Sequence, residues 1–233
     1  MLDNLKKKVL CANLELPKKG LVQYTWGNVS GIDRPSGLIA IKPSGVPYKN
    51  MTATDIVLID FEGRVIEGKL NPSSDAPSHI ELYKAFPDIG GICHTHSRWA
   101  TVWSQFGKGI APYGTTHADY FYGTIPCTRD LLKEEIELEY EKNTGLLIVE
   151  TFKNINPKQV PAVLVKNHGP FTWGKDADES VYNSVVLEEI AQMAWTLELR
   201  DPLLKKMPKV LLDKHFLRKH GDSAYYGQGT ESS

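Results

Sequence analysis

Near the start of the chain, apolar side chains recur three and four positions apart. Leu2, Leu5, Val9 and Ala12 follow this spacing, which predicts an amphipathic helix that ends before Pro17. Capping residues and apolar periods predict further helices over residues 73–86, 98–106, 130–140, 176–199 and 209–219. Helices therefore make up a large part of the expected structure.

Short apolar runs bounded by turn residues lie between these helices. They predict strands over residues 21–30, 38–41, 55–61, 64–67, 91–96, 146–152 and 162–166. Strands and helices do not alternate strictly one for one, so an all-parallel sheet is not favoured. We therefore expect an α/β fold of the α+β-like kind, as a single domain with a central mixed, mainly antiparallel β-sheet flanked by helices.

The composition is that of an ordinary globular protein and removes several functional classes. Of the 233 residues, 41% are hydrophobic and 24% are charged, which argues against a disordered chain. The formal net charge is −1, whereas general binding to nucleic acid or anionic membranes requires a basic excess. No apolar stretch reaches the roughly 18–20 residues of a membrane span. The sequence therefore predicts neither a nucleic-acid partner nor a membrane partner.

Cysteine usage bears on the cellular compartment. Cys11, Cys93 and Cys127 are widely spaced and odd in number, so they form neither a disulfide framework nor a CxxC pair. Reduced thiols in the cytoplasm are the simplest interpretation. The first ten residues carry four charged side chains and lack the apolar core of a signal peptide. We expect a cytoplasmic protein.

Three of the seven histidines are grouped in a way that composition does not explain. His94 and His96 stand two apart on a predicted strand, so both imidazoles project from one face. His168 lies at the end of another apolar strand, where functional sites are commonly built. Three neutral imidazoles with an open fourth position are typical of catalytic zinc, although manganese, cobalt or nickel would also fit. Asp75, at a helix start, is either a carboxylate of this site or a charge favoured by the helix dipole.

Two short segments are suited to bind an oxyanion. Lys42-Pro43-Ser44-Gly45 offers a cation, a hydroxyl and an amide at a turn, and Ser73-Ser74 offers hydroxyls and free amides where a helix begins. Asn28, which follows Gly27, either donates a hydrogen bond to the same anion or is only the end of a strand. Beside a metal site, these segments predict a small phosphorylated substrate.

The motifs together resemble a known family. They are TWGNVS (25–30), IKPSG (41–45), PSSDAPSH (72–79), GGICHTHSR (90–98), GTTHADYFYGTIPCTR (114–129), NHGPFTWGK (167–175) and LLDKHFLRKHG with AYYGQ (211–228). This set resembles the L-ribulose-5-phosphate 4-epimerase branch of the class II, zinc-dependent aldolase superfamily. The resemblance covers residues 1–228, which it implies form one domain of the class II aldolase and adducin-head type, with a disordered tail at 229–233.

The resemblance implies an isomerase that interconverts L-ribulose 5-phosphate and D-xylulose 5-phosphate. The inverted carbon, C4, bears no acidic hydrogen, so simple deprotonation cannot epimerise it. The family instead breaks the C3–C4 bond in a retro-aldol step, turns the glycolaldehyde phosphate over, and re-forms the bond on the opposite face. Such a reaction needs a Lewis acid, retention of the two-carbon fragment, and proton-transfer groups near the C4 oxygen.

The resemblance also assigns residue roles. It implies that Asp119 and Tyr226 are the catalytic proton-transfer groups. The implied Zn²⁺ site, which Mn²⁺ or Co²⁺ could also fill, consists of Asp75, His94, His96 and His168. The implied substrate and phosphate positions are Gly27, Asn28, Ser44, Gly45, Ser73 and Ser74, to which the turn chemistry adds Lys42. The lesser candidates are Thr115, Glu141, His215 and Arg218.

The same resemblance implies a homotetramer with active sites at subunit interfaces. It leaves open whether the enzyme serves L-arabinose degradation, L-ascorbate degradation or a related pentose phosphate route of carbohydrate metabolism. One alternative is a zinc-dependent sugar-phosphate aldolase like L-fuculose-1-phosphate aldolase, in which a glutamate typically occupies the position of Asp75. The other is a non-enzymatic binding module like the adducin head, whose relatives lack the metal-ligand histidines.

Overall fold

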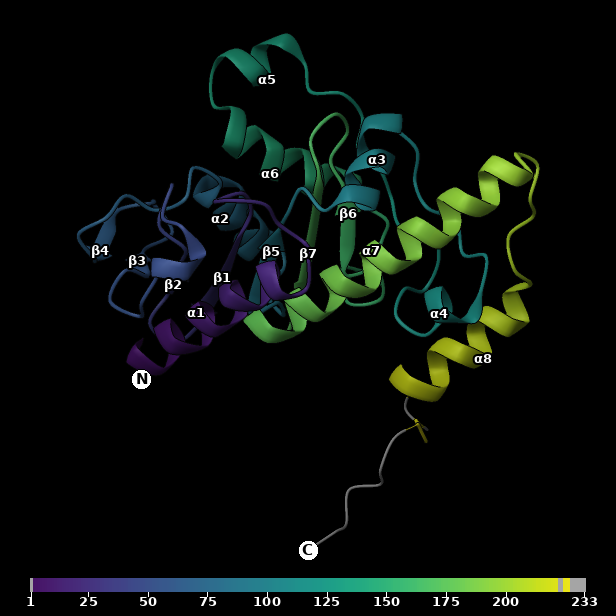
Figure 1. Cartoon of the computed structure of the whole chain (residues 1–233), viewed down its shortest axis with the longest axis horizontal. Coiled ribbons are helices and arrows are strands. Elements are labelled where there is room, and N and C mark those ends of the chain that lie inside the picture. Colours follow the sequence, from purple (N-terminus) through teal and green to yellow (C-terminus); the bar gives the residue numbers. More distant parts are fainter. Residues whose placement is uncertain (1, 222–223, 227–233) are drawn as a thin grey trace, which may run out of the picture.

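A seven-stranded β-sheet in the order β4-β3-β2-β1-β5-β7-β6 forms the centre of the protein (Figure 1). The computed structural model describes residues 2–221 and 224–226, so the expected tail at 229–233 lies outside the described residues. The strands are β1 (Asn28–Asp33), β2 (Leu38–Ile41), β3 (Val57–Ile59), β4 (Val65–Glu67), β5 (Gly91–His94), β6 (Ala162–Leu164) and β7 (Pro170–Gly174). Within the described part of the chain, all six strand pairings are antiparallel.

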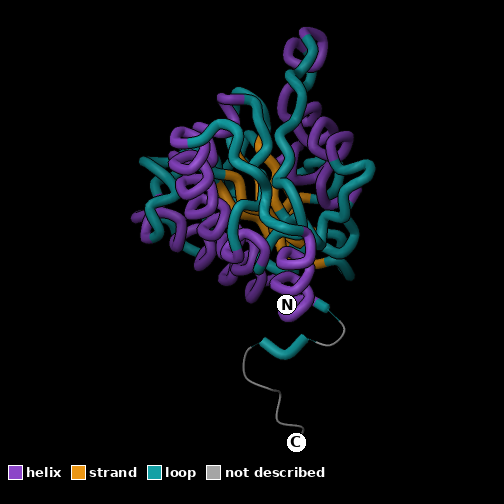
Figure 2. The backbone as a smooth tube through the Cα atoms, turned by 90° about the vertical axis from the view of Figure 1, so that its right-hand side faces the viewer, coloured by secondary structure: helices purple, strands orange, loops and turns teal. Residues whose placement is uncertain are grey.

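Helices cover both faces of this sheet. Figure 2 shows the strands in the interior of the molecule with helices around them. They are α1 (Leu2–Lys18), α2 (Ala76–Ala85), α3 (Arg98–Phe106), α4 (Thr115–Ala118), α5 (Lys133–Glu137), α6 (Tyr140–Thr151), α7 (Ala177–Arg200) and α8 (Lys209–His220), with a 3₁₀ turn η1 (Tyr48–Asn50). The expected α/β fold, a single domain with a mainly antiparallel sheet flanked by helices, is confirmed.

Alternation along the strands divides the core into two clusters. Val29, Ala40 and Leu58 pack with apolar residues of α1 and the start of α7. The residues that alternate with them, such as Ile39 and Ile92, pack on the other side with α2, α3 and α6. Because side chains two apart share a face, His94 lies on the same side of the sheet as Ile92.

The strand expected over residues 146–152 is wrong, because this segment belongs to α6. A short apolar run is consistent with either a buried strand or a buried helix segment. Gly145 lies inside the helix, where α6 packs closely on α2. A Cβ atom at this position would lie 2.8 Å from the carbonyl oxygen of Ser78. The acidic helix expected over 130–140 is accordingly short, and α6 begins at Tyr140.

The strand expected over residues 21–30 begins only at Asn28. Before it the chain turns, with positive φ angles at Tyr24 and Gly27 and a hydrogen bond from the Trp26 amide to the Gln23 carbonyl. A positive φ is incompatible with a regular strand. The first helix likewise continues through Pro17 to Lys18.

Strand β7 was not expected, because Gly169 and Pro170 at its start favour a turn. Pro170 instead occupies the first position of the strand, where the missing amide hydrogen costs nothing. The other predicted elements are present with small shifts at their ends, and the helix at 98–106 is reproduced as α3. No helix among residues 2–221 and 224–226 is long and apolar enough to cross a membrane.

Candidate metal and phosphate site

The three histidines singled out in the sequence lie together, and we call His94, His96 and His168 the imidazole site. Their ring centroids are 4.8–5.1 Å apart, and one nitrogen from each lies within 4.8 Å of the other two. His94 ends β5, His96 follows it by two residues, and His168 lies in the turn between β6 and β7. Antiparallel pairing of β5 with β7 brings this turn to the end of β5.

The neighbours of the imidazole site fix the orientation of its rings. His94 Nδ1 donates to the Pro170 carbonyl at 3.0 Å, so its Nε2 keeps a free lone pair. Phe171 stacks on the same ring with a centroid distance of 4.2 Å. The Tyr140 hydroxyl lies 3.3 Å from His168 Nδ1. Such outer partners orient metal-ligating histidines.

The protonation states of His96 and His168 suit a cation. Burial, reinforced by the charges of His94 and His96, lowers the pKa of His168 to about 3. Burial beside His94 also lowers the pKa of His96. Neutral imidazoles are the form that binds zinc and similar divalent metals. The residues present therefore fit a divalent metal ion, and the all-nitrogen donor set does not select one metal.

Asp75 stands beside the imidazole site at the N-cap position of α2. Its side chain makes no capping hydrogen bond and instead accepts from Asn28 Nδ2 at 2.6 Å. Burial alone would raise the pKa of Asp75, but the nearby imidazoles, led by His94, and the Asn28 amide hold it below its usual value. The carboxylate is therefore charged and faces the histidines, which fits a site residue better than a helix cap.

The two expected oxyanion segments lie next to each other. The Ser73 amide donates to the Lys42 carbonyl at 2.9 Å, and Pro43 and Pro72 form an antiparallel bridge. The Lys42 side chain is 2% exposed, and its ammonium contacts the carbonyls of Thr25 and Pro43 and the ring of Tyr48. Burial lowers the pKa of Lys42 to about 8. These contacts anchor a cation beside two serine-rich turns.

One cavity of about 460 Å³ joins the oxyanion segments to the imidazole site. The predicted residues that line it are Gly27, Asn28, Lys42, Ser44, Gly45, Ser73, Ser74, Asp75, His94, His96 and His168. Gly27 brings the backbone close to the imidazole site, because a Cβ at this position would lie 2.8 Å from the His94 carbonyl oxygen. Its φ of 75° is also one that few other residues adopt.

The remaining predicted residues do not line this cavity. Four of them join Lys219 in a second group, for which we use the name Asp119 cluster: Asp119, His215, Arg218, Lys219 and Tyr226. Asp119 follows α4, and its carboxylate accepts from Arg218 Nη2 through both oxygens at 3.0 Å. His215 Nδ1 lies 3.0 Å from Oδ1. α4 and α8 lie side by side at one edge of the molecule (Figure 1).

The charges around Asp119 determine its protonation. Burial would raise the pKa of this carboxyl, but hydrogen bonds from His215 and Arg218 and the positive charge of Lys219 hold it below its usual value. Tyr226 packs over Arg218 and Lys219 and is 61% exposed.

Two of the lesser candidates lie elsewhere. Thr115 begins α4 and is exposed, and Glu141 lies in the first turn of α6, where its carbonyl accepts from Ser78.

Several residues around the cavity were missed from the sequence. Trp26 lines the cavity, is 53% exposed, and has its ring centroid 6.3 Å from that of His96. Tyr140 and Phe171 contact the imidazole site as described above. Trp26 and Phe171 lie within the motifs already quoted, but only the antiparallel register shows what they touch. Lys219 also lay inside a quoted motif without an assigned role.

Comparison with known proteins agrees with this architecture. The model of the family described as class II aldolase and adducin N-terminal domain matches residues 7–195. A structure named L-fuculose 1-phosphate aldolase has a TM-score of 0.76 and 24% identity, covering 91% of this chain and 94% of that one. YgbL from Klebsiella pneumoniae, described as a putative aldolase/epimerase/decarboxylase, has a TM-score of 0.71 and 22% identity. This match covers 91% of this chain and 97% of that one. L-fuculose-1-phosphate aldolase from Thermus thermophilus has a TM-score of 0.68 and 22% identity, covering 88% of this chain and 100% of that one. This chain belongs to the class II aldolase and adducin N-terminal domain family.

Proposed function

We propose that the protein is a metal-dependent isomerase, an L-ribulose-5-phosphate 4-epimerase that produces D-xylulose 5-phosphate by cleaving and re-forming the C3–C4 bond. The observation that carries this proposal is the single cavity in which the imidazole site faces the Lys42 and serine turns. A cavity of this kind accommodates a sugar phosphate with its phosphate and its ketose oxygens held at opposite ends.

The imidazole site, with Asp75 beside it, would hold Zn²⁺ or a similar divalent ion. Such an ion supplies Lewis acidity toward the negative charge that develops on the ketose oxygens. The hydroxyls of Ser44, Ser73 and Ser74 and the Lys42 ammonium bind the phosphate. They keep the two-carbon aldehyde in place while it turns over, so recombination remains intramolecular.

Two proton transfers accompany the bond changes. As C3–C4 breaks, the C4 hydroxyl loses its proton to a nearby base, and the oxygen becomes the aldehyde carbonyl. As the bond re-forms on the other face, an acid on that side returns a proton to the C4 oxygen. Asp119 and Tyr226 are the pair that we assign to these roles. They lie outside the cavity of their own chain, so we propose that they complete the site of a neighbouring subunit in a homotetramer.

Incubation with L-ribulose 5-phosphate and a divalent metal tests the activity. We expect D-xylulose 5-phosphate as the product, with little free glycolaldehyde phosphate. Release of glycolaldehyde phosphate and dihydroxyacetone without D-xylulose 5-phosphate would refute the epimerase and identify an aldolase. Light scattering tests the assembly, and a fully active monomer would contradict the shared site.

An aldolase is the second candidate, and one observation favours it. The cavity of a single chain already contains the imidazole site, Asp75 and the oxyanion turns, which are the parts that reversible carbon–carbon cleavage requires. Two of the similar structures are L-fuculose-1-phosphate aldolases by name. Assay with L-fuculose 1-phosphate separates the candidates, because the epimerase should turn it over far more slowly than L-ribulose 5-phosphate.

A further inference from the structure

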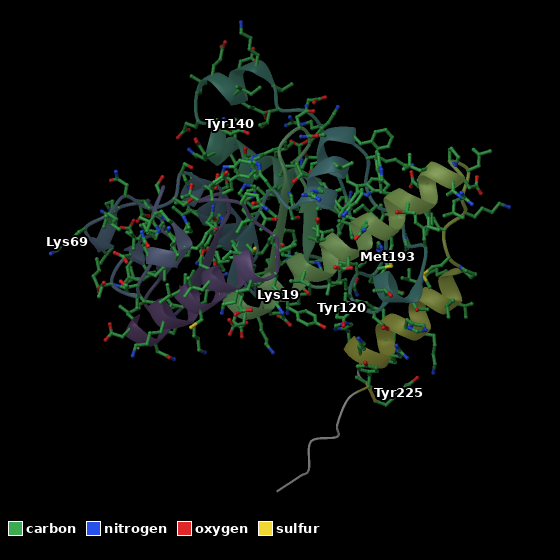
Figure 3. All side chains as sticks on the ribbon, in the orientation of Figure 1. Lys19, Lys69, Tyr120, Tyr140, Met193 and Tyr225 are labelled. Atoms are coloured by element: carbon green, nitrogen blue, oxygen red, sulfur yellow. The ribbon has the colours of Figure 1, made fainter. Side chains whose placement is uncertain are left out.

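The Lys219 ammonium of the Asp119 cluster contacts two tyrosine rings, those of Tyr120 and Tyr226. Its Nζ lies 4.2 Å from the ring centroid of Tyr120 and 4.2 Å from that of Tyr226. The side chain is 11% exposed. The Tyr120 hydroxyl is fixed by a 2.7 Å hydrogen bond to Tyr182 of α7. Figure 3 shows Tyr120 beside α7 and α8, and Tyr225 at the end of α8.

Lys219 is not needed to neutralise Asp119. Arg218 already contacts both carboxylate oxygens at 3.0 Å, whereas Lys219 Nζ lies 3.7 Å from Oδ2. The cluster of one carboxylate, one guanidinium and one ammonium therefore retains a positive charge. That charge faces the ring of Tyr226, and the negative face of an aromatic ring attracts a cation that is shielded from water.

We propose that Lys219 is a positioning residue for Tyr226, with two effects on it. It holds the ring beside Asp119, and it offsets the charge that Tyr226 acquires in proton transfer. When the phenol O–H bond breaks, the proton goes to the substrate oxygen and the electron pair stays on the phenolate oxygen. The ammonium then faces a negative ring, so the pair is neutral while the phenolate exists and regains its single positive charge when the proton returns. This second effect rests on the proposed function.

The position of the ring also depends on the backbone. The amides of Tyr225 and Tyr226 both donate to the Arg218 carbonyl, at 3.0 and 3.1 Å. These bonds bring the chain back over the last turn of α8. The contact between Lys219 and the Tyr226 ring adds a side-chain restraint on the same segment. Because this restraint acts on the position of residue 226, it can be measured without substrate.

Substitution of Lys219 by methionine tests the proposal in the full-length enzyme. Lys219→Met removes the charge and keeps most of the length of the unbranched side chain. We expect kcat on L-ribulose 5-phosphate to fall about 10- to 30-fold, since a shielded cation–π contact is worth about 2 kcal/mol. KM should change less than about twofold, because Tyr226 acts on the reacting oxygen and not on the phosphate.

Two matched variants sharpen the measurement. Lys214 makes the same kind of contact with the neighbouring Tyr225, at 5.0 Å, and Lys214→Met should leave kcat unchanged. Lys219→Arg keeps the charge and should recover most of the lost rate. An unchanged kcat in Lys219→Met, or an equal loss in Lys214→Met, would overturn the proposal.

Amide hydrogen exchange supplies a readout that does not depend on turnover. The Tyr226 amide should exchange faster in Lys219→Met than in the parent protein, and Lys214→Met should leave it unaltered. Faster exchange in a protein that lacks epimerase activity would support the positioning role and refute the proposed function. Equal exchange in Lys219→Met and the parent would overturn the positioning role itself, whatever the activity.

Discussion

The imidazole site draws its residues from strand ends and turns of the central sheet, whereas the Asp119 cluster joins α4 to α8 near the C-terminus. His94 is 2% exposed and is held by the register of three strands. Tyr226 is 61% exposed and is held by one helix, through the Arg218 carbonyl and the side chains of Arg218 and Lys219. Tyr140, which contacts His168, lies well apart from Tyr120 and Tyr225 in Figure 3. Buried strand ends fix the positions of the imidazole rings, whereas a cluster at the surface can reach a second subunit.

Loss of a metal ligand should give the largest effect. His96→Asn removes one of the three imidazoles that converge at the end of β5. We expect metal and activity to be lost together, with a rate decrease on the order of a thousandfold or more, because Lewis acidity supplies several kcal/mol. Metal analysis of the purified protein with a parallel rate assay checks this. Full activity without bound metal would remove the imidazole site from the mechanism.

Loss of the charge at Asp119 should separate the two regions. Asp119 lies outside the cavity, so the metal content of Asp119→Asn should stay at the level of the parent protein. Activity should fall by about 100- to 1000-fold, the usual contribution of a proton-transfer group. Retention of most turnover would show that Asp119 only anchors Arg218.

Mixing the two variants tests whether the regions meet across subunits. Tetramers reassembled from His96→Asn and Asp119→Asn chains contain sites with both residues intact only if each site uses two chains. Random mixing would restore roughly a quarter of the sites. Each variant reassembled with itself is the control, and no recovery in the mixture would place both groups in one chain.

Gly27→Ala should affect the imidazole site and leave the Asp119 cluster unchanged. The added Cβ would approach the His94 carbonyl to 2.8 Å, and the positive φ adds strain. We expect a loss of about 1–3 kcal/mol in the free energy of unfolding together with weaker metal binding. Gly45→Ala is the matched control, since Gly45 also has a positive φ but has open space around its Cα. Denaturant unfolding and metal titration of both variants separate strain from the close contact.

The smallest effect concerns pH. Burial lowers the pKa of Lys42 to about 8, so the ammonium form is present below that pH and is lost as the pH rises through it. The KM for a sugar phosphate should therefore increase above pH 8, by up to about tenfold, as one charged phosphate contact disappears. Lys42→Met should show a high KM at every pH without this inflection. A parallel increase in the variant would assign the pH dependence to another group.

Sequence and structure agree best where chemistry restricts the residue type. The HxH spacing and the distant His168 indicated the imidazole site, and the serine turns indicated the oxyanion segments, because few residues can perform these tasks. The apolar segment of α6 and strand β7 were missed, since their identity depends on packing partners distant in sequence. Gly145 suggests a turn until α2 is placed against it. Likewise Lys219 has no visible role until α8 brings it between Tyr120 and Tyr226.

The stacking of Phe171 on His94 provides a spectroscopic reporter. The two rings are nearly parallel, with an angle of 19° and a centroid distance of 4.2 Å. The magnetic field induced in the phenyl ring shifts the resonances of protons above its face, so the carbon-bound protons of His94 should appear upfield of those of the exposed histidines. Because this shift depends steeply on the separation of the rings, small movements of His94 on ligand binding can be followed in solution by isotope labelling of histidine alone.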